Sequence, residues 1–174
     1  MNAEISNLER HHTIAILVDN EPGVLARVIG LFAGRGYNIE SLTVSEIDAI
    51  KGYSRITIVT SGTEMVIEQI KALLARLVPV HKVEDLSLEG PCLERELALV
   101  KILNLGEQRI EALRIADMFR ARAVDSTLES FVFELTGSPR KIDAFIELMD
   151  GLGEIEISRG GVVAIARGSD LGLR

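Results

Sequence analysis

The chain has 174 residues with 47% apolar and 26% charged side chains, a composition that excludes a disordered protein and allows two domains of about 75 residues each. The net charge of −7 argues against a broad nucleic-acid-binding surface, so we expect no nucleic-acid partner. The single cysteine, Cys92, excludes an intramolecular disulfide and favours a reducing, cytoplasmic location.

The N-terminal segment, residues 1–10, has no basic region followed by an apolar one. We therefore expect a frayed tail and no signal peptide. No stretch of the chain approaches the roughly 18 consecutive apolar residues of a membrane-spanning helix, so we expect no membrane association.

A strand followed by a short amphipathic helix opens the ordered part of the chain. Residues 11–18 become almost continuously apolar, which predicts a buried strand. Pro22 and Gly23 stop this strand. A helix is predicted from Val24 because apolar residues then recur at helical spacing, and Gly34 and Gly36 should end it.

The pattern continues with a hairpin, a second helix and a last strand. The predicted elements are strands at residues 37–47 and 53–60, a helix capped by Thr63, and a strand at 78–86. Pro79 cannot donate to a sheet ladder, which favours an edge position for the last strand. Gly90 and Pro91 then mark residues 87–95 as a linker.

The same order of elements recurs after the linker. Predicted strands cover residues 96–103, 123–126 and 130–135, and predicted helices cover 107–120 and a segment capped by Ser138. Residues 155–166 contain a final strand, or a bent pair of strands around Gly160 and Gly161.

Two βαββαβ units in tandem predict an α+β fold made of two ferredoxin-like sandwiches. The predicted domains are residues 11–86 and 96–168, joined by the linker at 87–95. Each should have four antiparallel strands covered on one face by two helices. The open faces and edges of such sheets must be hidden, so we expect self-association.

The polar loop before the first helix is a candidate site for a small anion. The first N–H groups of a helix lack intrahelical partners and carry partial positive charge, and Gly23 places no Cβ in the way of a ligand. Asn20 and Asn38 each offer a donor and an acceptor, which suits the carboxylate and ammonium groups of an amino acid.

Val24, Leu25 and Ile39 are expected to supply an apolar wall for a branched aliphatic side chain. After the costs of association, a dissociation constant in the micromolar-to-millimolar range is reasonable. A purely structural interpretation is also open, in which Asn20 caps the helix, Gly23 turns the chain and Asn38 satisfies backbone groups.

No cluster in the sequence predicts catalysis or metal binding. His11 and His12 are adjacent in a strand and should point to opposite faces, so they cannot act as a simple pair of ligands. His81 is isolated, and Cys92 has no neighbouring group that would activate its thiol. We expect no catalytic residue and no metal site.

The long motif N-x-P-G-V-L-x-R-V-x-G-L-F-x-x-R-G-Y-N-I-E-S-L at residues 20–42 resembles the ACT domain of the small regulatory subunit of acetohydroxyacid (acetolactate) synthase. The later runs S-R-I-T-I-V-T and R-E-L-A-L-V-K-I are also similar to that subunit. The similarity extends from about residue 12 to about residue 168, nearly the whole chain.

The resemblance implies a non-catalytic subunit that activates a large catalytic subunit and confers feedback inhibition by valine or another branched-chain amino acid. It implies an effector site between two ACT domains of a dimer, formed here by Asn20, Gly23, Val24, Leu25, Asn38 and Ile39. This chain would hold no cofactor, whereas the catalytic partner would use thiamine diphosphate, magnesium and FAD. Pro22 has no N–H and cannot donate to an effector.

The second repeat departs from this pattern, because ungapped counting places Ile110 opposite Gly23 and Asp125 opposite Asn38. We therefore expect no equivalent effector site there, and a role for the second domain in dimerisation or in contact with the catalytic partner. Two other functions stay open: an independent ACT-type amino-acid-binding regulator of another enzyme, and a small ferredoxin-like enzyme.

Overall fold

The computed structural model describes residues 10–88, 90–103, 106–169 and 172. The chain forms two compact units, one made of Met1–Leu93 with Val163–Arg174 and the other of Glu94–Val162. Nearly all of the predicted N-terminal tail lies outside the described residues, and Arg10 already belongs to the first strand.

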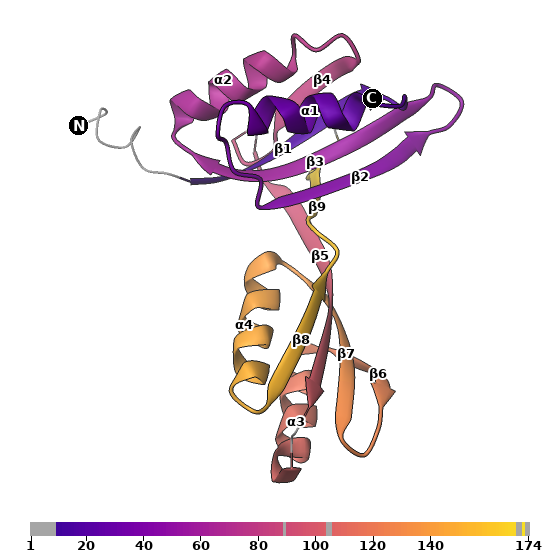
Figure 1. Cartoon of the computed structure of the whole chain (residues 1–174), viewed down its shortest axis with the longest axis vertical. Helices are drawn as coiled ribbons and strands as arrows, with labels where there is room; N and C mark the ends of the chain where they lie inside the picture. Colours follow the sequence, from indigo (N-terminus) through magenta and orange to yellow (C-terminus); the bar gives the residue numbers. More distant parts are fainter. Residues whose placement is uncertain (1–9, 89, 104–105, 170–171, 173–174) are drawn as a thin grey trace, which may run out of the picture. The chain divides into compact units, whose positions relative to one another are not determined.

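An antiparallel four-stranded sheet with the strand order β2-β3-β1-β4 forms the first unit. Helices α1 and α2 lie on one face of this sheet (Figure 1). The elements are β1 (Arg10–Asp19), α1 (Val24–Ala33), β2 (Ser41–Asp48), β3 (Tyr53–Gly62), α2 (Glu64–Leu74) and β4 (Val80–Asp85). Strands β2 and β4 are the edges, so the edge position predicted for the strand after Pro79 is confirmed.

Side chains along β1 alternate between the two faces of the sheet, and those on the helix-bearing face help to hold this unit together. Ile14, Ile16 and Val18 point to the helix-bearing face and are essentially inaccessible to solvent. They pack against apolar side chains that recur at helical spacing on α1 and α2, including Phe32 and Ile70. Burial of such side chains contributes roughly 1.5–3 kcal/mol each, which makes this the main core of the unit.

Part of the opposite face of the first sheet is covered by the last strand, β9 (Val163–Ala166). Ala164 of β9 packs with Ala15 and Leu17, the β1 residues that point away from the helices. The guanidinium of Arg55 on β3 donates to the carbonyl of Ala164 at 2.7 Å. Burial lowers the pKa of Arg55, and the carboxylate of Glu84 opposes that change. The chain therefore covers part of its own open sheet face.

The second unit repeats the fold with the strand order β6-β7-β5-β8. Its elements are β5 (Cys92–Leu103), the 3-10 turn η2 (Gly106–Gln108), α3 (Arg109–Phe119), β6 (Arg122–Ser126), β7 (Ser130–Gly137), α4 (Pro139–Asp150) and β8 (Glu154–Arg159). β9 also pairs with β5, whose first residues, Cys92 and Leu93, belong to the first unit.

An aromatic and aliphatic core fills the second unit. Phe133 on β7 and Phe145 on α4 meet edge-on, with ring centroids 6.1 Å apart. Outside this core, Arg159 on β8 pairs with the buried carboxylate of Glu96 and with Asp143 on α4. The hydrogen bond to Glu96 is the main cause of the raised pKa of Arg159, so this guanidinium stays charged.

The predicted α+β class and tandem βαββαβ units are confirmed, while several boundaries differ. β2 begins at Ser41 rather than at residue 37, and β5 begins at Cys92, inside the predicted linker. Residues 163–168, predicted as part of the second domain, group with the first unit. Thr63 and Ser138 occupy the positions before their helices, but neither side chain makes the predicted capping hydrogen bond.

Candidate effector-binding site

The loop between β1 and α1 ends at Gly23, where the backbone conformation favours a glycine although there is room for a side chain. Gly23 has φ 85°, in the left-handed region, and a Cβ built there would meet nothing within 4 Å. The Asn20 N–H donates to the carbonyl of Gly52 at 2.7 Å, which ties the loop to the turn between β2 and β3. The Gly23 carbonyl accepts from the N–H of Arg27 at 3.1 Å and starts the helix.

The N-terminus of α1 remains open to a ligand. The N–H groups of Leu25 and Ala26 find no acceptor among the described residues, and no side chain caps the helix. Asn20 instead donates its side-chain amide to the Glu46 carboxylate on β2 at 2.6 Å. The structural interpretation of Asn20 as a helix cap is therefore wrong, and Glu46 enters the site without having been predicted.

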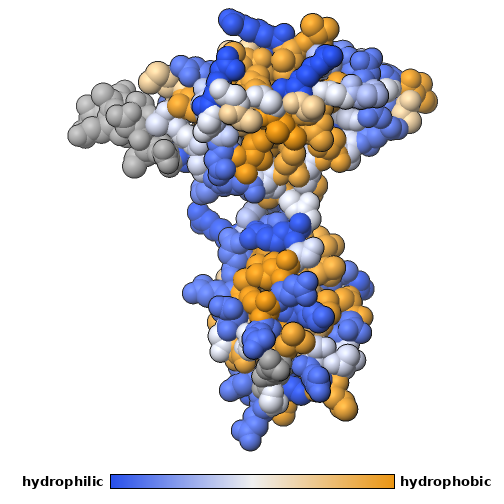
Figure 2. Space-filling view, viewed as in Figure 1, coloured by the Kyte–Doolittle hydropathy of each residue, from blue (hydrophilic) through white to orange (hydrophobic). Residues whose placement is uncertain are grey.

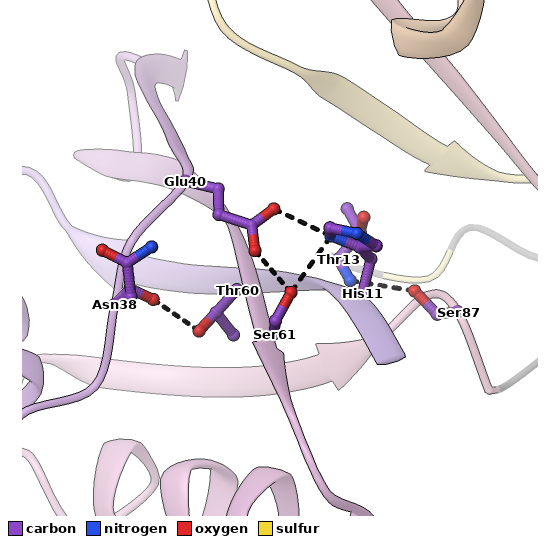
Figure 3. Close-up of polar contacts among 7 residues, drawn as sticks. All are labelled: His11, Thr13, Asn38, Glu40, Thr60, Ser61 and Ser87. Atoms are coloured by element: carbon purple, nitrogen blue, oxygen red, sulfur yellow. Dashed lines mark hydrogen bonds and ion pairs between the residues drawn. The ribbon is translucent and has the colours of Figure 1, made fainter. Parts of the chain in front are cut away.

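Asn38 lies at the other end of α1, in the segment that leads into β2. Its backbone carbonyl accepts a hydrogen bond from the Thr60 hydroxyl at 2.6 Å. Figure 3 shows that its carboxamide points away from Thr60, and the residue is exposed. The Asn38 side chain therefore takes no part in the hydrogen bond to Thr60 and is accessible to solvent.

Within one chain, Asn20 and Asn38 are too far apart to share a small ligand. Asn20 contacts Glu46, near the end of β2, whereas Asn38 precedes Ser41, the first residue of that strand. At about 3.3 Å per residue, Ser41 and Glu46 alone are separated by roughly 16 Å. That span exceeds the length of a branched-chain amino acid. A site that uses both carboxamides therefore needs a second copy of the chain.

The predicted apolar wall is only partly exposed. Leu25 is 37% exposed, whereas Val24 is 4% exposed and its side chain belongs to the core beneath α1. Ile39 is half-buried and packs against the same core. Val44 of β2, which was not predicted, is 44% exposed and lies on the helix-bearing face because its partner Ile56 is in that core. In Figure 2, apolar surface is visible around α1 and β2.

The histidines have ordinary structural surroundings. His11 is exposed and its Nδ1 lies 2.8 Å from the Glu40 carboxylate and 3.1 Å from the Ser61 hydroxyl (Figure 3). His12 points to the other face, as predicted, and its Nδ1 lies 2.7 Å from the buried Asp85 carboxylate. Because Glu40 and Ser61 contact the same nitrogen of His11, the cluster lacks the relay of a hydrolase triad, in which the base uses both ring nitrogens.

His81 and Cys92 are also explained by packing. His81 lies 2.6 Å from Asp19 and its ring packs at a tilt against Tyr53, and Cys92 packs against the cluster that contains Ala164. The described ranges contain no group of three or more His, Cys, Asp or Glu side chains placed to hold a metal ion. Of the helices in the described part of the chain, none is long and apolar enough to cross a membrane.

In the second unit, the first helix α3 begins differently from α1. The residue before α3 is Gln108 in a right-handed helical conformation, and a 3-10 turn precedes it. Ile110, counted opposite Gly23, is inside α3 and 65% exposed, and Asp125 is on the edge strand β6. Asn104, two residues before this turn in the sequence, lies outside the described residues.

Comparison with known families agrees with the fold. Residues 14–82 match the acetohydroxyacid synthase (AHAS) small-subunit-like ACT domain, and residues 95–168 match the family described as the small subunit of acetolactate synthase. The class defined by fold and site is therefore that of ACT-domain regulatory proteins.

Whole-chain relatives extend this result. The probable acetolactate synthase small subunit of Archaeoglobus fulgidus is 46% identical, with 91% of this chain and 98% of that protein covered. The isozyme 3 small subunit of Escherichia coli is 43% identical, with 91% and 96% covered. A crystal structure of the Thermotoga maritima small subunit has a TM-score of 0.82 at 39% identity, with 92% and 99% covered. The chain belongs to the family of small, regulatory and non-catalytic subunits of acetolactate synthase.

Proposed function

We propose that this chain activates the acetolactate synthase catalytic subunit and confers feedback inhibition by valine, the end product of a branched-chain amino acid pathway. The observation that supports valine sensing is the open N-terminus of α1, where the N–H groups of Leu25 and Ala26 face no protein acceptor among the described residues. A carboxylate placed there would accept charge-assisted hydrogen bonds worth about 1.5–3 kcal/mol each.

A homodimer completes this site. β2 is an edge strand whose outer residues, from Val44 to Ile47, are exposed. Antiparallel pairing of two β2 edges would place the beginning of one strand beside the end of the other. Asn38 and Ile39 of one copy would then approach Asn20, Gly23 and Leu25 of the second. Two equivalent effector sites would form, one at each end of the paired strands.

The position of the effector between copies explains how binding could regulate an enzyme. A ligand held by both copies favours one arrangement of the pair over another, and only such differential affinity can shift an equilibrium. A coupling free energy of about 1–3 kcal/mol between the effector and the bound catalytic subunit would be enough for strong inhibition. Leucine or isoleucine would occupy the same site if its apolar wall accepts the longer side chain.

The catalytic chemistry would belong to the partner. In this proposal the large subunit holds thiamine diphosphate, magnesium and FAD, and this chain contributes binding and regulation in the cytoplasm. The second unit, which has no counterpart of the Gly23 turn, would support the dimer or contact the catalytic subunit.

The test is copurification of the full chain with the acetolactate synthase large subunit, followed by an assay of acetolactate formation. We expect a stable complex, higher activity than for the large subunit alone, and a decrease in activity when valine is added. A complex that forms and is active but ignores valine would contradict the effector assignment. Absence of a complex, with valine still bound by the isolated chain, would favour the alternative of an ACT-type regulator of another enzyme.

A further inference from the structure

Glu46 is a charged side chain that directly contacts a residue of the candidate site. It lies on β2 opposite Ser54 and two residues after Val44, so it shares the helix-bearing face of the sheet. Its carboxylate accepts the side-chain amide of Asn20 at 2.6 Å and is otherwise open to solvent. The anionic group therefore stands beside the loop that leads to the open N-terminus of α1.

Three other carboxylates lie near predicted site residues, and all are differently placed. Asp19 precedes Asn20, but its carboxylate pairs with His81. Glu40 follows Asn38, but its oxygens are already engaged by His11 and Ser61. Glu21 belongs to the loop itself and contributes its backbone carbonyl to the N–H of Val24 at 3.4 Å. Among the described residues, only the Glu46 carboxylate contacts one of the carboxamides assigned to the effector.

An amino acid carries two opposite charges on groups that are attached to the same carbon atom. The helix N-terminus favours the carboxylate, but it repels the ammonium group through the same partial positive charge. A free amino acid therefore binds well only if an acceptor, and preferably an anion, stands near the helix start. Asn20 offers one carbonyl oxygen, and its amide is held by Glu46 so that this oxygen has a defined direction.

We propose that Glu46 is the ammonium-recognising residue of the effector site, which makes the site selective for amino acids over carboxylic acids that lack the amino group. This inference rests on the proposed function and assigns one further residue to it. The negative charge of Glu46 attracts the ammonium group and repels an isolated carboxylate. Selectivity therefore depends on the charge of Glu46, in addition to its hydrogen bond with Asn20.

The test is calorimetric titration of the full chain with valine and with 3-methylbutanoate, which has the same branched chain and carboxylate but no amino group. Glu46→Gln removes the charge and keeps an oxygen that can accept the Asn20 amide. We expect the preference for valine over 3-methylbutanoate to fall by about tenfold, because the attraction between two unit charges in a site partly shielded from water is worth about one decade in affinity. Glu68→Gln on α2, an exposed carboxylate paired with Lys71, is the matched control and should leave the preference unchanged.

Each other outcome has a distinct meaning. An unchanged preference in Glu46→Gln would overturn the inference and leave the proposed function in place, since Glu46 would then only hold Asn20. If that unchanged preference came with equally tighter binding of both ligands, Glu46 would only repel carboxylates. Failure of the wild-type chain to bind valine, alone or with the large subunit, would overturn the proposed function and this inference together.

Discussion

Gly23 is the residue at which backbone conformation and ligand recognition can be separated most cleanly. Its φ of 85° is unfavourable for most side chains, yet a Cβ at this position would meet open space. Asn and Asp tolerate this left-handed conformation better than other residues. A pair of substitutions can therefore hold the strain constant and change only the charge.

Gly23→Asp should abolish feedback inhibition by valine while stimulation of the large subunit persists. The added carboxylate would stand at the N-terminus of α1, where it would occupy the N–H groups and repel the carboxylate of the effector. We expect at least a tenfold increase in the valine concentration that gives half-maximal inhibition, which corresponds to about 1.4 kcal/mol.

Gly23→Asn is the control for this change, because it has nearly the same shape and no charge. It should retain more valine sensitivity than Gly23→Asp. Equal loss in both variants would show that strain at this turn, rather than charge at the helix N-terminus, controls inhibition. Full sensitivity in Gly23→Asp would contradict the assignment of the loop as the carboxylate site.

The sequence predicted the positions of the site better than the orientation of its side chains. Asn20 and Asn38 are exposed as expected, because polar residues that flank an amphipathic helix lie outside its apolar stripe. Val24 belongs to that stripe and is buried, so its presence in the motif gives no exposed wall. Glu46 could not be found from spacing, since its contact with Asn20 joins residues 26 positions apart across two strands.

At the scale of elements, β9 is the feature that local sequence patterns could not place. A bent pair around Gly160 and Gly161 was one of two predicted possibilities, and the structure has β8 and β9 on either side of this turn. A run of four residues carries no signal for which sheet it will cover. The expected need to hide the open face of the first sheet was sound, but part of that face is covered by the chain itself.

Ala164→Asn should destabilise the first unit by about 1–3 kcal/mol, because it buries an amide among apolar side chains. Ala164 is 8% exposed, whereas the adjacent Val163 is 57% exposed. Val163→Asn is therefore the matched control, with an expected change within about 0.5 kcal/mol. Equal stability of the two variants would contradict the role of β9 as a cover for this sheet.

Tyrosine fluorescence provides a measurement specific to this unit. The chain has two tyrosines and no tryptophan, and both Tyr37 and Tyr53 belong to the first unit. Tyr53 also packs against the cluster that contains Ala164. Urea unfolding followed by this signal should show a lower midpoint for Ala164→Asn and the wild-type midpoint for Val163→Asn.

For the whole molecule, the repeated order of strands and helices was sufficient to predict two sandwiches in tandem. Helical and alternating periodicities are local properties, and each repeat displays both clearly. The limits of the units were less predictable because they depend on long-range pairing. β5 runs from the first unit into the second, and the chain returns to the first unit at Val163.

The number of copies of the chain determines whether the proposed effector site can be complete. Since Asn20 and Asn38 lie near opposite ends of β2, a single copy of the chain cannot complete the proposed site. Effector binding and dimerisation should therefore be linked. Valine would stabilise the dimer by mass action, and the dimer would bind valine more tightly than a separated chain.

The most direct test of the account is calorimetric titration of valine into the complex of this chain with the acetolactate synthase large subunit, for the wild type and for Gly23→Asp. We expect saturable heat in the wild-type complex, with a dissociation constant between about 1 μM and 1 mM, and a loss of that heat in Gly23→Asp. No heat from valine, leucine or isoleucine in an active wild-type complex, or unchanged binding in Gly23→Asp, would contradict it.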